Sequence, residues 1–350
     1  MASIDFIQPS NPDWGRLLTQ ALYHDFYHLP EYHEIAEARG EGEAILCVYR
    51  DGEFIIAIPL LLRQIEDPEG SGRCRALDAT SVYGYAGPLV SRPPLPEVVR
   101  RFQSALGQAL RERNVVSVFS RLHPLLSQVQ CLDGLGWLEP AGSTTSIDLR
   151  LAPEEQRARY RRNHKHGINK LQRLGVVCFA DPGFEHFAEF IDLYHETMRR
   201  VQASSYYFFD RAYFDQLRGA LGQRLHLYVC CHGGRAICGG LFVHTGRIVQ
   251  YHLGGTDGEY LNWAPMKLLF DTVRRDFSGG DAGWFHLGGG LGAQRDSLFH
   301  FKKGFGGEEH LFVLWKWVVQ EAVYEDLCQR RSGAKHDSAT GFFPSYRMTS

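Results

Sequence analysis

The sequence predicts an α/β (α+β) protein made of two similar units in tandem, each with a mixed central sheet flanked by helices. The order hairpin, third strand, helix and strand occurs in both halves of the chain. Each hairpin has a turn, Asp51-Gly52 or Gly233-Gly234, whose residues readily take positive φ. The length of 350 residues also suggests two domains, at ~150 residues each. Residue identity between the halves is weak, so the duplication is inferred from the order of the elements.

The first half of the chain alternates strand-like runs with one long amphipathic stretch. Apolar residues at a spacing of three and four over residues 96–114 are typical of a helix that covers a sheet. The expected elements are, in order, helices over 13–15 and 31–39, strands over 44–49 and 54–62, a charged, glycine-rich loop over 65–75, a third strand over 83–90, the helix over 96–114, a buried strand over 115–119, a helix over 124–132 and a closing strand over 143–149.

The second half repeats this order after a helical insertion. Pro265 occupies an allowed first-turn position in the helix that follows the third strand. The expected elements are helices over 153–174, 184–201 and 211–221, strands over 228–231, 236–244 and 248–255, a helix over 264–277, a strand over 284–287, a strand over 311–315 and a helix over 318–329. Beyond Arg330 the sequence is polar, and we expect a mobile tail.

These elements predict the domain organisation. An N-terminal domain over residues 1–150 is followed by a C-terminal domain over residues 151–310, which contains the helical insertion. The strand and helix of residues 311–331 could return to the first domain, and residues 332–350 form the polar tail.

Composition excludes several classes of protein. With 44% hydrophobic residues, 22% charged residues and a net charge of -2, the chain is typical of a soluble globular protein, and any basic surface must be local. The eight cysteines include no CxxC pair, which favours buried thiols in a reducing cytoplasm. The N-terminus lacks a signal-peptide pattern, and no apolar run approaches the ~20 residues that span a bilayer. The histidines show no zinc-binding spacing, so we expect a cytoplasmic protein without a metal site.

The strongest local charge lies in the first helix of the insertion. No acidic residue interrupts residues 156–180, and the basic residues there are Arg157, Arg159, Arg161, Arg162, Lys165, Lys170 and Arg173. On one continuous helix, Arg157, Arg161 and Lys165 would form a stripe whose like charges repel by roughly a few tenths of a kcal/mol per pair. An anionic partner would remove that cost, which suggests a phosphate-bearing ligand or RNA. A solvated helix face is the alternative.

A second candidate site centres on Lys302 and Lys303, which stand among Phe299, Phe301 and Phe305 and close to glycines. A lysine held against aromatic rings loses part of its hydration, so its charge acts strongly on a nearby anion. Such a group could stabilise negative charge during acyl transfer or hold a phosphate, and we expect the Lys302 amine to be withdrawn from bulk solvent. The alternative is a solvated turn before a strand, with the phenylalanines in the core.

Other motifs give weaker signals. The glycine run at residues 288–290 follows a strand but lacks the spacing of a dinucleotide fingerprint, although its amides could form a small anion-binding nest. Asp257 and Asp296 are better explained as turn residues than as general bases. No Ser–His–Asp or Cys–His arrangement is evident from spacing.

Three segments together resemble the Fem-type (FemABX-like) aminoacyl-tRNA-dependent transferases, a branch of the GNAT-like superfamily. They are the basic residues 160–165, the strand over residues 284–289, which resembles the family's strand ending in aromatic-x-Gly-Gly, and residues 298–305, which resemble its Phe-Lys-x-x-Phe signature. The likeness is clearest from about Tyr160 to Phe305, and the first half matches mainly in element order. The resemblance implies a tandem pair of GNAT-like domains.

The resemblance also implies an activity. Fem-type enzymes transfer an aminoacyl group from a charged tRNA to the amino group of a peptide or nucleotide-linked acceptor, here a peptidoglycan precursor or a peptide natural product. By analogy, Lys302 would stabilise the oxyanion or the departing ribose oxygen, and Phe301 would help to form the acyl site. Arg161, Arg162 and Lys165 would contact phosphates of the acceptor or the tRNA. The further candidate substrate-binding residues are Tyr206, Tyr207, Gly288, Gly289 and Lys303. Aminoacyl-tRNA is then a co-substrate, and no cofactor is expected.

The chain departs from the family's pattern at His286, where an acid is frequent, and it lacks a long coiled-coil insertion; both departures leave the acceptor open. An aminoacyl ester is already activated, so its transfer needs positioning, proton removal and a stabilised oxyanion but no catalytic triad. One alternative is an acyl-CoA-dependent N-acyltransferase, whose pyrophosphate loop is matched only by residues 39–44, which carry glutamates and precede a strand. The other alternative is a non-catalytic RNA- or peptide-binding module.

Overall fold

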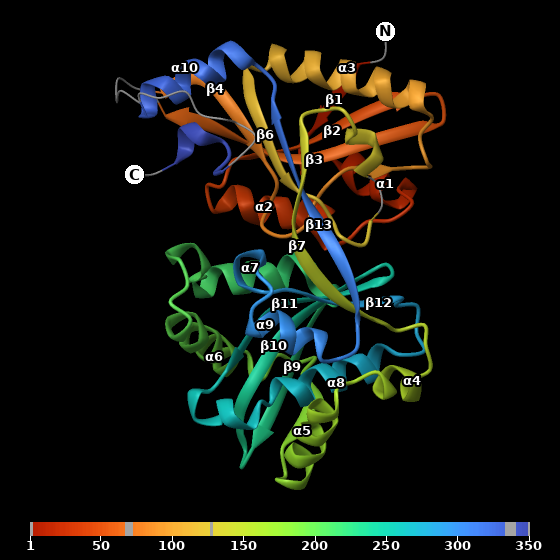
Figure 1. Ribbon diagram of the computed structural model, residues 1–350, viewed down its shortest axis with the longest axis vertical. Helices are drawn as coiled ribbons and strands as arrows, with labels where there is room; N and C mark the ends of the chain where they lie inside the picture. Colours follow the sequence, from red (N-terminus) through yellow and green to blue (C-terminus); the bar gives the residue numbers. More distant parts are fainter. Residues whose placement is uncertain (1–2, 67–72, 127–128, 333–340, 349–350) are drawn as a thin grey trace. The chain divides into compact units, whose positions relative to one another are not determined.

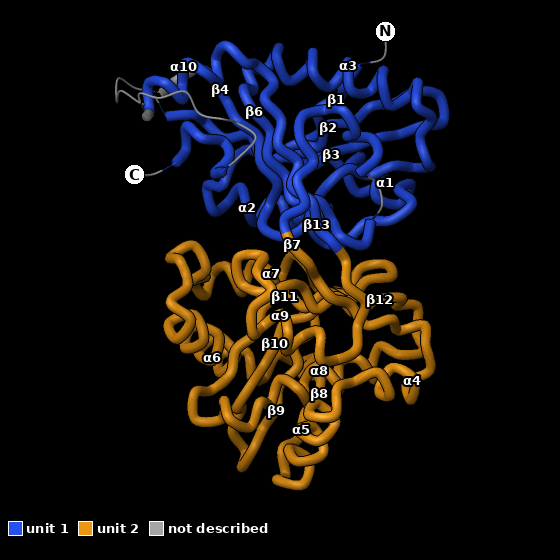
Figure 2. Tube along the Cα trace, viewed as in Figure 1, with its two compact units in different colours: residues 1–141, 311–350 blue, residues 142–310 orange. Residues whose placement is uncertain are grey.

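The computed structural model describes residues 3–66, 73–126, 129–332 and 341–348, and it contains two compact units (Figure 1 and Figure 2). Unit 1 contains Met1–Ala141 and Leu311–Ser350, and unit 2 contains Gly142–His310. The chain passes from unit 1 to unit 2 within strand β7 (Trp137–Asp148) and returns within strand β13 (Glu308–Val318). The units therefore meet at residue 141 and not at the expected residue 150, because the second part of β7 pairs with a strand of unit 2.

Unit 1 is built on a mixed sheet with the strand order β1-β2-β3-β4-β6-β13. Neighbouring strands are antiparallel except for β4 and β6, which run parallel. The short strand β5 (Leu89–Val90) pairs with β3 outside this order. The other strands are β1 Ile4–Ile7, β2 Glu43–Asp51, β3 Phe54–Glu66, β4 Arg73–Thr80 and β6 Val115–Arg121.

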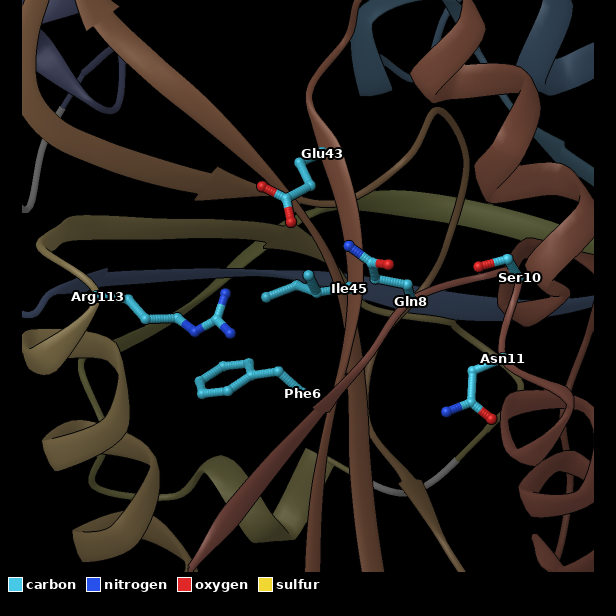
Figure 3. A pocket seen from close by; sticks show the side chains of 7 residues that line it. All are labelled: Phe6, Gln8, Ser10, Asn11, Glu43, Ile45 and Arg113. Atoms are coloured by element: carbon cyan, nitrogen blue, oxygen red, sulfur yellow. The ribbon is translucent and has the colours of Figure 1, made fainter.

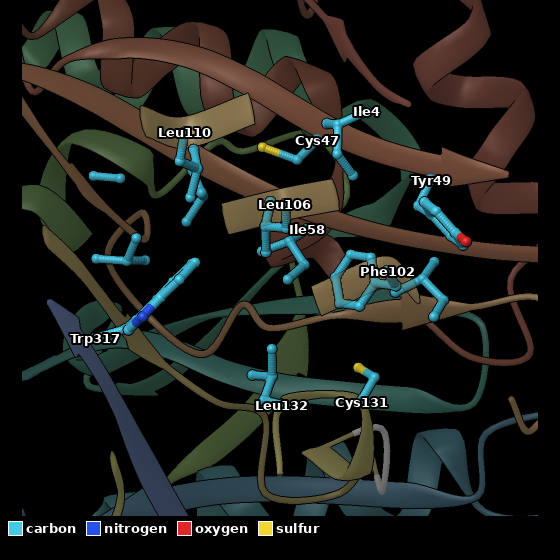
Figure 4. Close-up of a cluster of buried hydrophobic side chains, with 14 of the residues drawn as sticks. Ile4, Cys47, Tyr49, Ile58, Phe102, Leu106, Leu110, Cys131, Leu132 and Trp317 are labelled. Carbon is cyan, nitrogen blue, oxygen red and sulfur yellow. The ribbon is translucent and has the colours of Figure 1, made fainter. Parts of the chain in front are cut away.

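Helices cover the sheet of unit 1. Helix α3 (Pro96–Glu112) begins with proline in its first turn and packs against β2 and β6. Its apolar face places Phe102, Leu106 and Leu110 in a buried cluster, where Phe102 contacts Tyr49 of β2 (Figure 4). The other helices of this unit are α1 Pro12–Gln20, α2 Pro30–Ala38 and α10 Glu321–Ser332.

Unit 2 has a sheet with the strand order β8-β9-β10-β11-β12-β7. Its neighbouring strands are antiparallel except for β11 and β12, which run parallel. The strands are β8 Val177–Ala180, β9 Leu225–His232, β10 Arg235–Thr245, β11 Ile248–Thr256 and β12 Trp284–Gly289.

The helices of unit 2 lie on both faces of its sheet. Successive β10 residues point to opposite faces, and Gly239 approaches Phe190 of α6 whereas Gly240 approaches Leu269 of α8. Helix α8 contacts α5, and the α8 face encloses an apolar core. The helices are α4 Pro153–Ala158, α5 Arg162–Arg173, α6 Phe187–Arg200, α7 Arg211–Leu221, α8 Met266–Phe277 and α9 Ser297–Lys303.

The two units share one arrangement of strands. Read from β1 in unit 1 and from β8 in unit 2, each sheet has the same sequence of antiparallel pairs, one parallel pair and a final antiparallel pair. In each unit the final strand, β13 or β7, is the one in which the chain crosses between units. The tandem duplication predicted from element order is therefore confirmed by the topology.

Three expected elements of unit 1 were wrong. The third strand is β4, whereas most of residues 83–90 form a loop that ends in β5. Strand β4 takes up part of the predicted 65–75 loop, of which residues 67–72 lie outside the described residues. Within residues 124–132 the structure has turns and a 3-10 helix, η2 (Val129–Leu132), with residues 127–128 outside the description. The polar sequence of β4 concealed a strand because Asp78 is buried there against Arg63 and Arg347.

The single helix expected over residues 153–174 is two helices, α4 and α5. The chain turns between them, where the Arg161 N–H donates to the carbonyl O of Gly304 at 2.8 Å. Arg157, at the end of α4, forms an ion pair with Asp271 at 3.0 Å. The predicted stripe of Arg157, Arg161 and Lys165 on one continuous helix is therefore wrong.

The C-terminal segment is a packed part of unit 1 over its described residues, 341–348. The Phe343 ring stacks on Tyr324 of α10, with centroids 5.8 Å apart. The hydroxyl of Tyr346 lies 2.8 Å from Ser117 Oγ and donates to Asp78 Oδ2 at 3.3 Å. The prediction of a mobile tail is wrong for these residues, because apolar rings and a buried carboxylate hold them in place.

Candidate active site

Lys302 lies in α9, and its side chain is buried in unit 2, with 6% of the residue exposed. Its Nζ donates to the carbonyl O of Gly289 at 2.7 Å and lies 5.5 Å from the centroid of the Tyr251 ring. Burial lowers the pKa of Lys302 to about 8, although the carboxylate of Asp296 opposes this shift. At neutral pH the amine therefore carries its charge in surroundings where charge acts strongly on a ligand. The expectation that this amine is withdrawn from bulk solvent is confirmed.

Two glycines of β12 allow the strand to approach the lysine. Gly288 has a φ of 75°, and a Cβ atom there would lie 3.4 Å from Lys302 Nζ. A Cβ atom on Gly289 would lie 2.7 Å from the carbonyl O of Ser143 on the neighbouring strand. A side chain at either position would strain the backbone or displace β7. The structure thus brings Gly288, Gly289 and Lys302 together, and the substrate-binding role of the glycines stays a prediction.

Asp296 holds the N-terminus of α9. Its Oδ1 accepts the N–H of Phe299 at 2.8 Å, and its Oδ2 accepts the N–H of Leu291 at 3.0 Å. Partial burial raises the pKa of Asp296, but the backbone N–H groups and the charge of Lys302 outweigh it and hold this pKa below its ordinary value. The sequence predicted a turn residue here; in the structure Asp296 is a helix cap, and it fixes the helix that carries Lys302.

Lys302 lies where two parallel strands separate. Strands β11 and β12 pair from Ile248–Trp284 to Gln250–His286. Among the described residues their pairing ends there, although β11 continues to Thr256 and β12 continues to Gly289. Tyr251 and Gly289, which contact the Lys302 amine, belong to these separated ends. The amine is therefore presented to the region between the two strands.

Phe301 packs in the core beside this site. Its ring centroid lies 5.4 Å from that of His164, 5.7 Å from that of Phe305 and 6.1 Å from that of Phe270. Its carbonyl O accepts a hydrogen bond from His164 Nε2 at 2.9 Å. Burial lowers the pKa of His164 to about 4, so the imidazole is neutral. These contacts attach α9 to α5, and the role of Phe301 in an acyl site stays a prediction.

The predicted basic residues lie around the junction of α5 with α9. The guanidinium of Arg161 donates to the carbonyl O of His300 at 3.3 Å. Arg162 is exposed in the first turn of α5, and Lys165 donates to the carbonyl O of Ala158 at 2.7 Å. Arg161 is thus brought to the helix that carries Lys302, whereas Arg162 faces solvent.

The remaining predicted residues lie elsewhere. Lys303 donates to the carbonyl O of Gly307 at 2.9 Å and forms an ion pair with Glu309 at 3.2 Å, so it supports the turn after α9. Tyr206 and Tyr207 belong to the 3-10 helix η3 (Ser205–Tyr207) between α6 and α7. Their role as substrate contacts stays a prediction.

Some residues of the site were not identified from the sequence. No local pattern distinguishes Tyr251, because it lies far from Lys302 along the chain and comes close to it only when the sheet forms. The buried residues Gln250, Ser146 and His286 were also missed, although the departure from the family pattern at His286 was a signal. Their arrangement across neighbouring strands depends on register, which single segments do not reveal.

A hollow of about 220 Å³ occurs in unit 1 (Figure 3). It is lined by Phe6, Gln8, Ser10, Asn11, Glu43, Ile45 and Arg113. Its charged side chains, Glu43 and Arg113, belong to exposed residues, and solvated charges contribute little to binding. In the described ranges, no group of three or more His, Cys, Asp or Glu is placed to hold a metal ion. Nor does any helix in those ranges have the length and apolarity needed to cross a bilayer.

Comparisons with known proteins bear on the fold. Residues 158–303 match the family model described as an acetyltransferase (GNAT) domain. FemX is similar in structure, with a TM-score of 0.67, 14% identity and coverage of 91% of this chain and 98% of that chain. The C-terminal domain of a putative lysylphosphatidylglycerol synthetase from Agrobacterium fabrum has a TM-score of 0.55 and 12% identity, and covers 93% and 99% of the two chains. L-PGS from Bacillus licheniformis has a TM-score of 0.51 and 12% identity, with coverage of 89% and 92%.

These comparisons show a fold and a kind of domain. A search of curated protein sequences finds no match. The structural similarity spans both units, so the predicted tandem GNAT-like fold and the resemblance to the Fem-type branch are confirmed at the level of the fold. The matched segment lies within unit 2 and includes Lys302, so the similarity to GNAT acetyltransferase domains covers most of unit 2.

Proposed function

We propose that this chain, whose fold is that of the Fem-type, GNAT-like transferases, moves an aminoacyl group from a charged tRNA to the amino group of a peptide or nucleotide-linked acceptor. The product is an amide, and the acceptor is a peptidoglycan precursor or a peptide natural product. One observation carries the proposal: the Lys302 amine is buried, charged at neutral pH and held at the point where β11 and β12 separate. No carboxylate in the described chain forms an ion pair with it.

The buried ammonium suits the charge that develops in acyl transfer. When an amine attacks an ester, the carbonyl oxygen becomes an oxyanion, and a nearby cation in a site of low polarity stabilises it. An ammonium has three N–H groups, of which the Gly289 carbonyl accepts one. Lys302 can therefore donate to the oxyanion or to the departing ribose oxygen without losing the bond that positions it.

Charge distribution supports a tRNA donor over coenzyme A. On α5 the exposed residues Arg162, Lys170 and Arg173 have no carboxylate partner among the described residues, which suits a polyanion. The turn from β11 to α8, where an acyl-CoA enzyme cradles pyrophosphate with backbone amides, instead carries Asp257 and Glu259. The two carboxylates share Arg235 as their ion-pair partner, and the net negative charge that remains disfavours a pyrophosphate.

An acyl-CoA-dependent N-acyltransferase is the second candidate, and the match of residues 158–303 to an acetyltransferase domain favours it. Both reactions pass through the same kind of oxyanion, so Lys302 would serve either donor. The acidic turn before α8 is the feature that weighs against this candidate, and direct competition between donors separates the two.

Purified protein incubated with a panel of charged tRNAs, with acetyl-CoA in parallel, and with peptide or nucleotide-linked amines tests the proposal. We expect a labelled aminoacyl amide that forms only when both a charged tRNA and an amine are present. An amide that forms with acetyl-CoA as the donor, but with none of the charged tRNAs, would indicate an acyl-CoA-dependent N-acyltransferase. Binding of RNA or peptide without product from either donor, unchanged in Lys302→Ala, would indicate a non-catalytic module.

A further inference from the structure

Four polar side chains lie side by side across neighbouring strands of unit 2. Gln250 on β11 is in register with His286 on β12, and His286 is in register with Ser146 on β7. Ser146 Oγ lies 2.6 Å from Nε2 of His310 on β13. We call Gln250, His286, Ser146 and His310 the polar row. Three of its members are buried, and His310 is half-buried.

The polar row lies on the sheet face opposite α8. Phe285 and Leu287, the neighbours of His286, belong to the apolar core beneath α8, and side chains alternate along a strand. Ile147 on β7 belongs to the same core, so Ser146 also points the other way. Helix α6 covers this opposite face at β10 and β11, and its linker to α7 carries Tyr206 and Tyr207. The Lys302 amine lies beside the Tyr251 ring, which packs against the core beneath α8. A substrate between β11 and β12 would therefore meet Lys302 on one face of the sheet and the polar row on the other.

The amide of Gln250 fixes the tautomer of His286. Gln250 Nε2 donates to the carbonyl O of Tyr251 at 3.0 Å, so its Oε1 is the atom that faces His286. His286 Nδ1 lies 2.6 Å from that oxygen and must donate to it. In the neutral imidazole the proton is therefore on Nδ1, and Nε2 carries the basic lone pair.

The polar row also offers a route by which a proton can leave. Residues directly opposite each other on antiparallel strands have Cβ atoms about 4.5–5.5 Å apart, which places the Ser146 hydroxyl beside the His286 ring. A hydroxyl both donates and accepts, so Ser146 can receive a proton from one histidine and pass one to His310. His310 is the member that reaches solvent.

We propose that His286 is the proton acceptor for the attacking amine, with Gln250 and Ser146 as positioning residues. This inference rests on the proposed transferase function but not on the identity of the donor. The free amine attacks the carbonyl carbon and forms the C–N bond while its N–H proton passes to His286 Nε2. Collapse breaks the bond from carbon to the leaving oxygen or sulfur, which takes a proton from Lys302. The proton on His286 then leaves through Ser146 and His310, and solvent reprotonates Lys302.

The other titratable groups near His286 can be assigned. Asp148 lies two residues after Ser146 on β7 and is paired with Arg150. His252 lies two residues after Gln250 on β11, and its Nε2 is 3.4 Å from the Tyr213 hydroxyl. The hydrogen bond and the strand register place the side chains of Gln250 and Ser146 beside the His286 ring.

Transfer to two amines tests this role. An alkyl amine such as glycinamide needs a base, whereas hydroxylamine is uncharged at neutral pH and attacks esters without one. We expect His286→Gln to lower transfer to glycinamide about 100-fold or more, and transfer to hydroxylamine by less than about 5-fold. The pH dependence of kcat/KM with glycinamide should lose its acidic limb. His244→Gln, a variant of another histidine of the same sheet, is the matched control and should match wild type with both amines.

The outcomes separate this inference from the proposed function. The comparison uses aminoacyl-tRNA or acetyl-CoA, whichever supports turnover, so a failure of the tRNA donor leaves the role of His286 testable. Equal losses with both amines would indicate a structural histidine and overturn the proposal, as would an unchanged pH profile. An absence of turnover by the wild-type protein with either donor would overturn both conclusions. The 15N resonances of His286 add a readout without substrate: protonation on Nε2 in the neutral ring would contradict the assigned tautomer.

Discussion

Each unit buries one lysine among its described residues, and the two lysines are held in different ways. Lys316 of unit 1 forms an ion pair with Glu139, so its charge is compensated directly. Lys302 of unit 2 donates to a carbonyl oxygen, and Asp296, the carboxylate that acts on its charge, is occupied by backbone N–H groups. Burying a charge without a paired counter-charge costs free energy, and such costs persist where a function needs them. The comparison supports the proposal that Lys302 is the functional lysine and that Lys316 has a structural role.

The parallel strands of the two units also differ, because those of unit 1 stay paired and those of unit 2 separate. In unit 1 the parallel strands β4 and β6 stay paired as far as Thr80–Phe119, and the Ser81 N–H then donates to the Phe119 carbonyl O at 3.0 Å. In unit 2 the corresponding pair separates after Gln250–His286. The place that α9 takes in the chain order of unit 2 is taken in unit 1 by η2, whose residues Cys131 and Leu132 are buried in the apolar cluster. The two units share one fold, and the features on which the proposed chemistry depends lie in unit 2.

Replacing each lysine by methionine gives the largest expected contrast. We expect Lys302→Met to lower the rate of transfer by about 100- to 1,000-fold, because a charge that stabilises the oxyanion is lost. Lys316→Met should keep the rate within about twofold, since its partner Glu139 is partly exposed and remains solvated. Single-turnover rates with saturating donor measure the effect, and circular dichroism confirms that both variants fold. Similar losses in the two variants would remove the distinction between the lysines.

Removing residues 341–350 tests the packing of unit 1 alone. The deletion takes away Tyr346 and Arg347, which contact the buried carboxylate of Asp78, and the Phe343 ring. We expect the free energy of unfolding of unit 1 to fall by about 2–4 kcal/mol, because breaking a buried ion-pair network is costly. Hydrogen exchange should accelerate in β4 and β6 and stay unchanged in β10 and β11.

A milder variant sharpens that test. Tyr346→Phe removes one hydroxyl and leaves the ring, so it should cost about 1 kcal/mol. Unchanged exchange in β4 after the full deletion would mean that the C-terminal segment does not stabilise unit 1.

The pH dependence of stability provides a third test. The pKa of Lys302 is lowered from its ordinary value to about 8, so between about pH 8 and pH 10.5 the unfolded chain binds a proton that the folded chain does not. Wild-type stability should therefore rise with pH across this window relative to Lys302→Met, by up to about 3 kcal/mol. Transfer activity should fall over the same range as the ammonium is lost. Urea unfolding from pH 7 to pH 10.5 measures the difference, and Lys316→Met should keep the rise.

Sequence patterns predicted elements whose determinants are local. Helix α7 was predicted at its observed bounds of Arg211–Leu221, and α3 was predicted from its apolar spacing. Strand β4 was missed because its buried Asp78 depends on partners far along the chain. The break between α4 and α5 has no proline or glycine to mark it, since it is set by contact of Arg161 with Gly304. Local propensity therefore identified elements, and tertiary contacts decided where some of them end.

The candidate site also contains residues that local sequence patterns predicted and residues that depend on tertiary contacts. Lys302 was identified because aromatic residues and glycines surround it in the sequence, and a turn residue was expected at Asp296, where the structure has the cap of a helix. The depth of its burial could not be predicted, because it depends on Tyr251 and Gly289 of two other strands. The polar row was invisible for the same reason, since it exists only once the register of β7, β11 and β12 is set.

The smallest expected effect concerns basic residues of unit 2 that differ in whether a carboxylate is paired with them. Lys170 and Arg173 on α5 are exposed and have no carboxylate partner in the described ranges, whereas Arg159 is paired with Glu155 at 2.8 Å. If α5 contacts an RNA backbone, each unpaired cation should release counterions on binding, and an already paired one should not. Lys170→Gln and Arg173→Gln should each reduce the slope of log K against log salt by roughly 1 for uncharged tRNA.

Arg159→Gln is the matched control, and its slope should equal that of wild type. Fluorescence anisotropy between about 50 and 200 mM salt measures these slopes. Equal slopes in all of these variants would place the RNA elsewhere or remove it from the proposed reaction, because a surface that binds phosphates cannot lose two charges without a change in salt dependence.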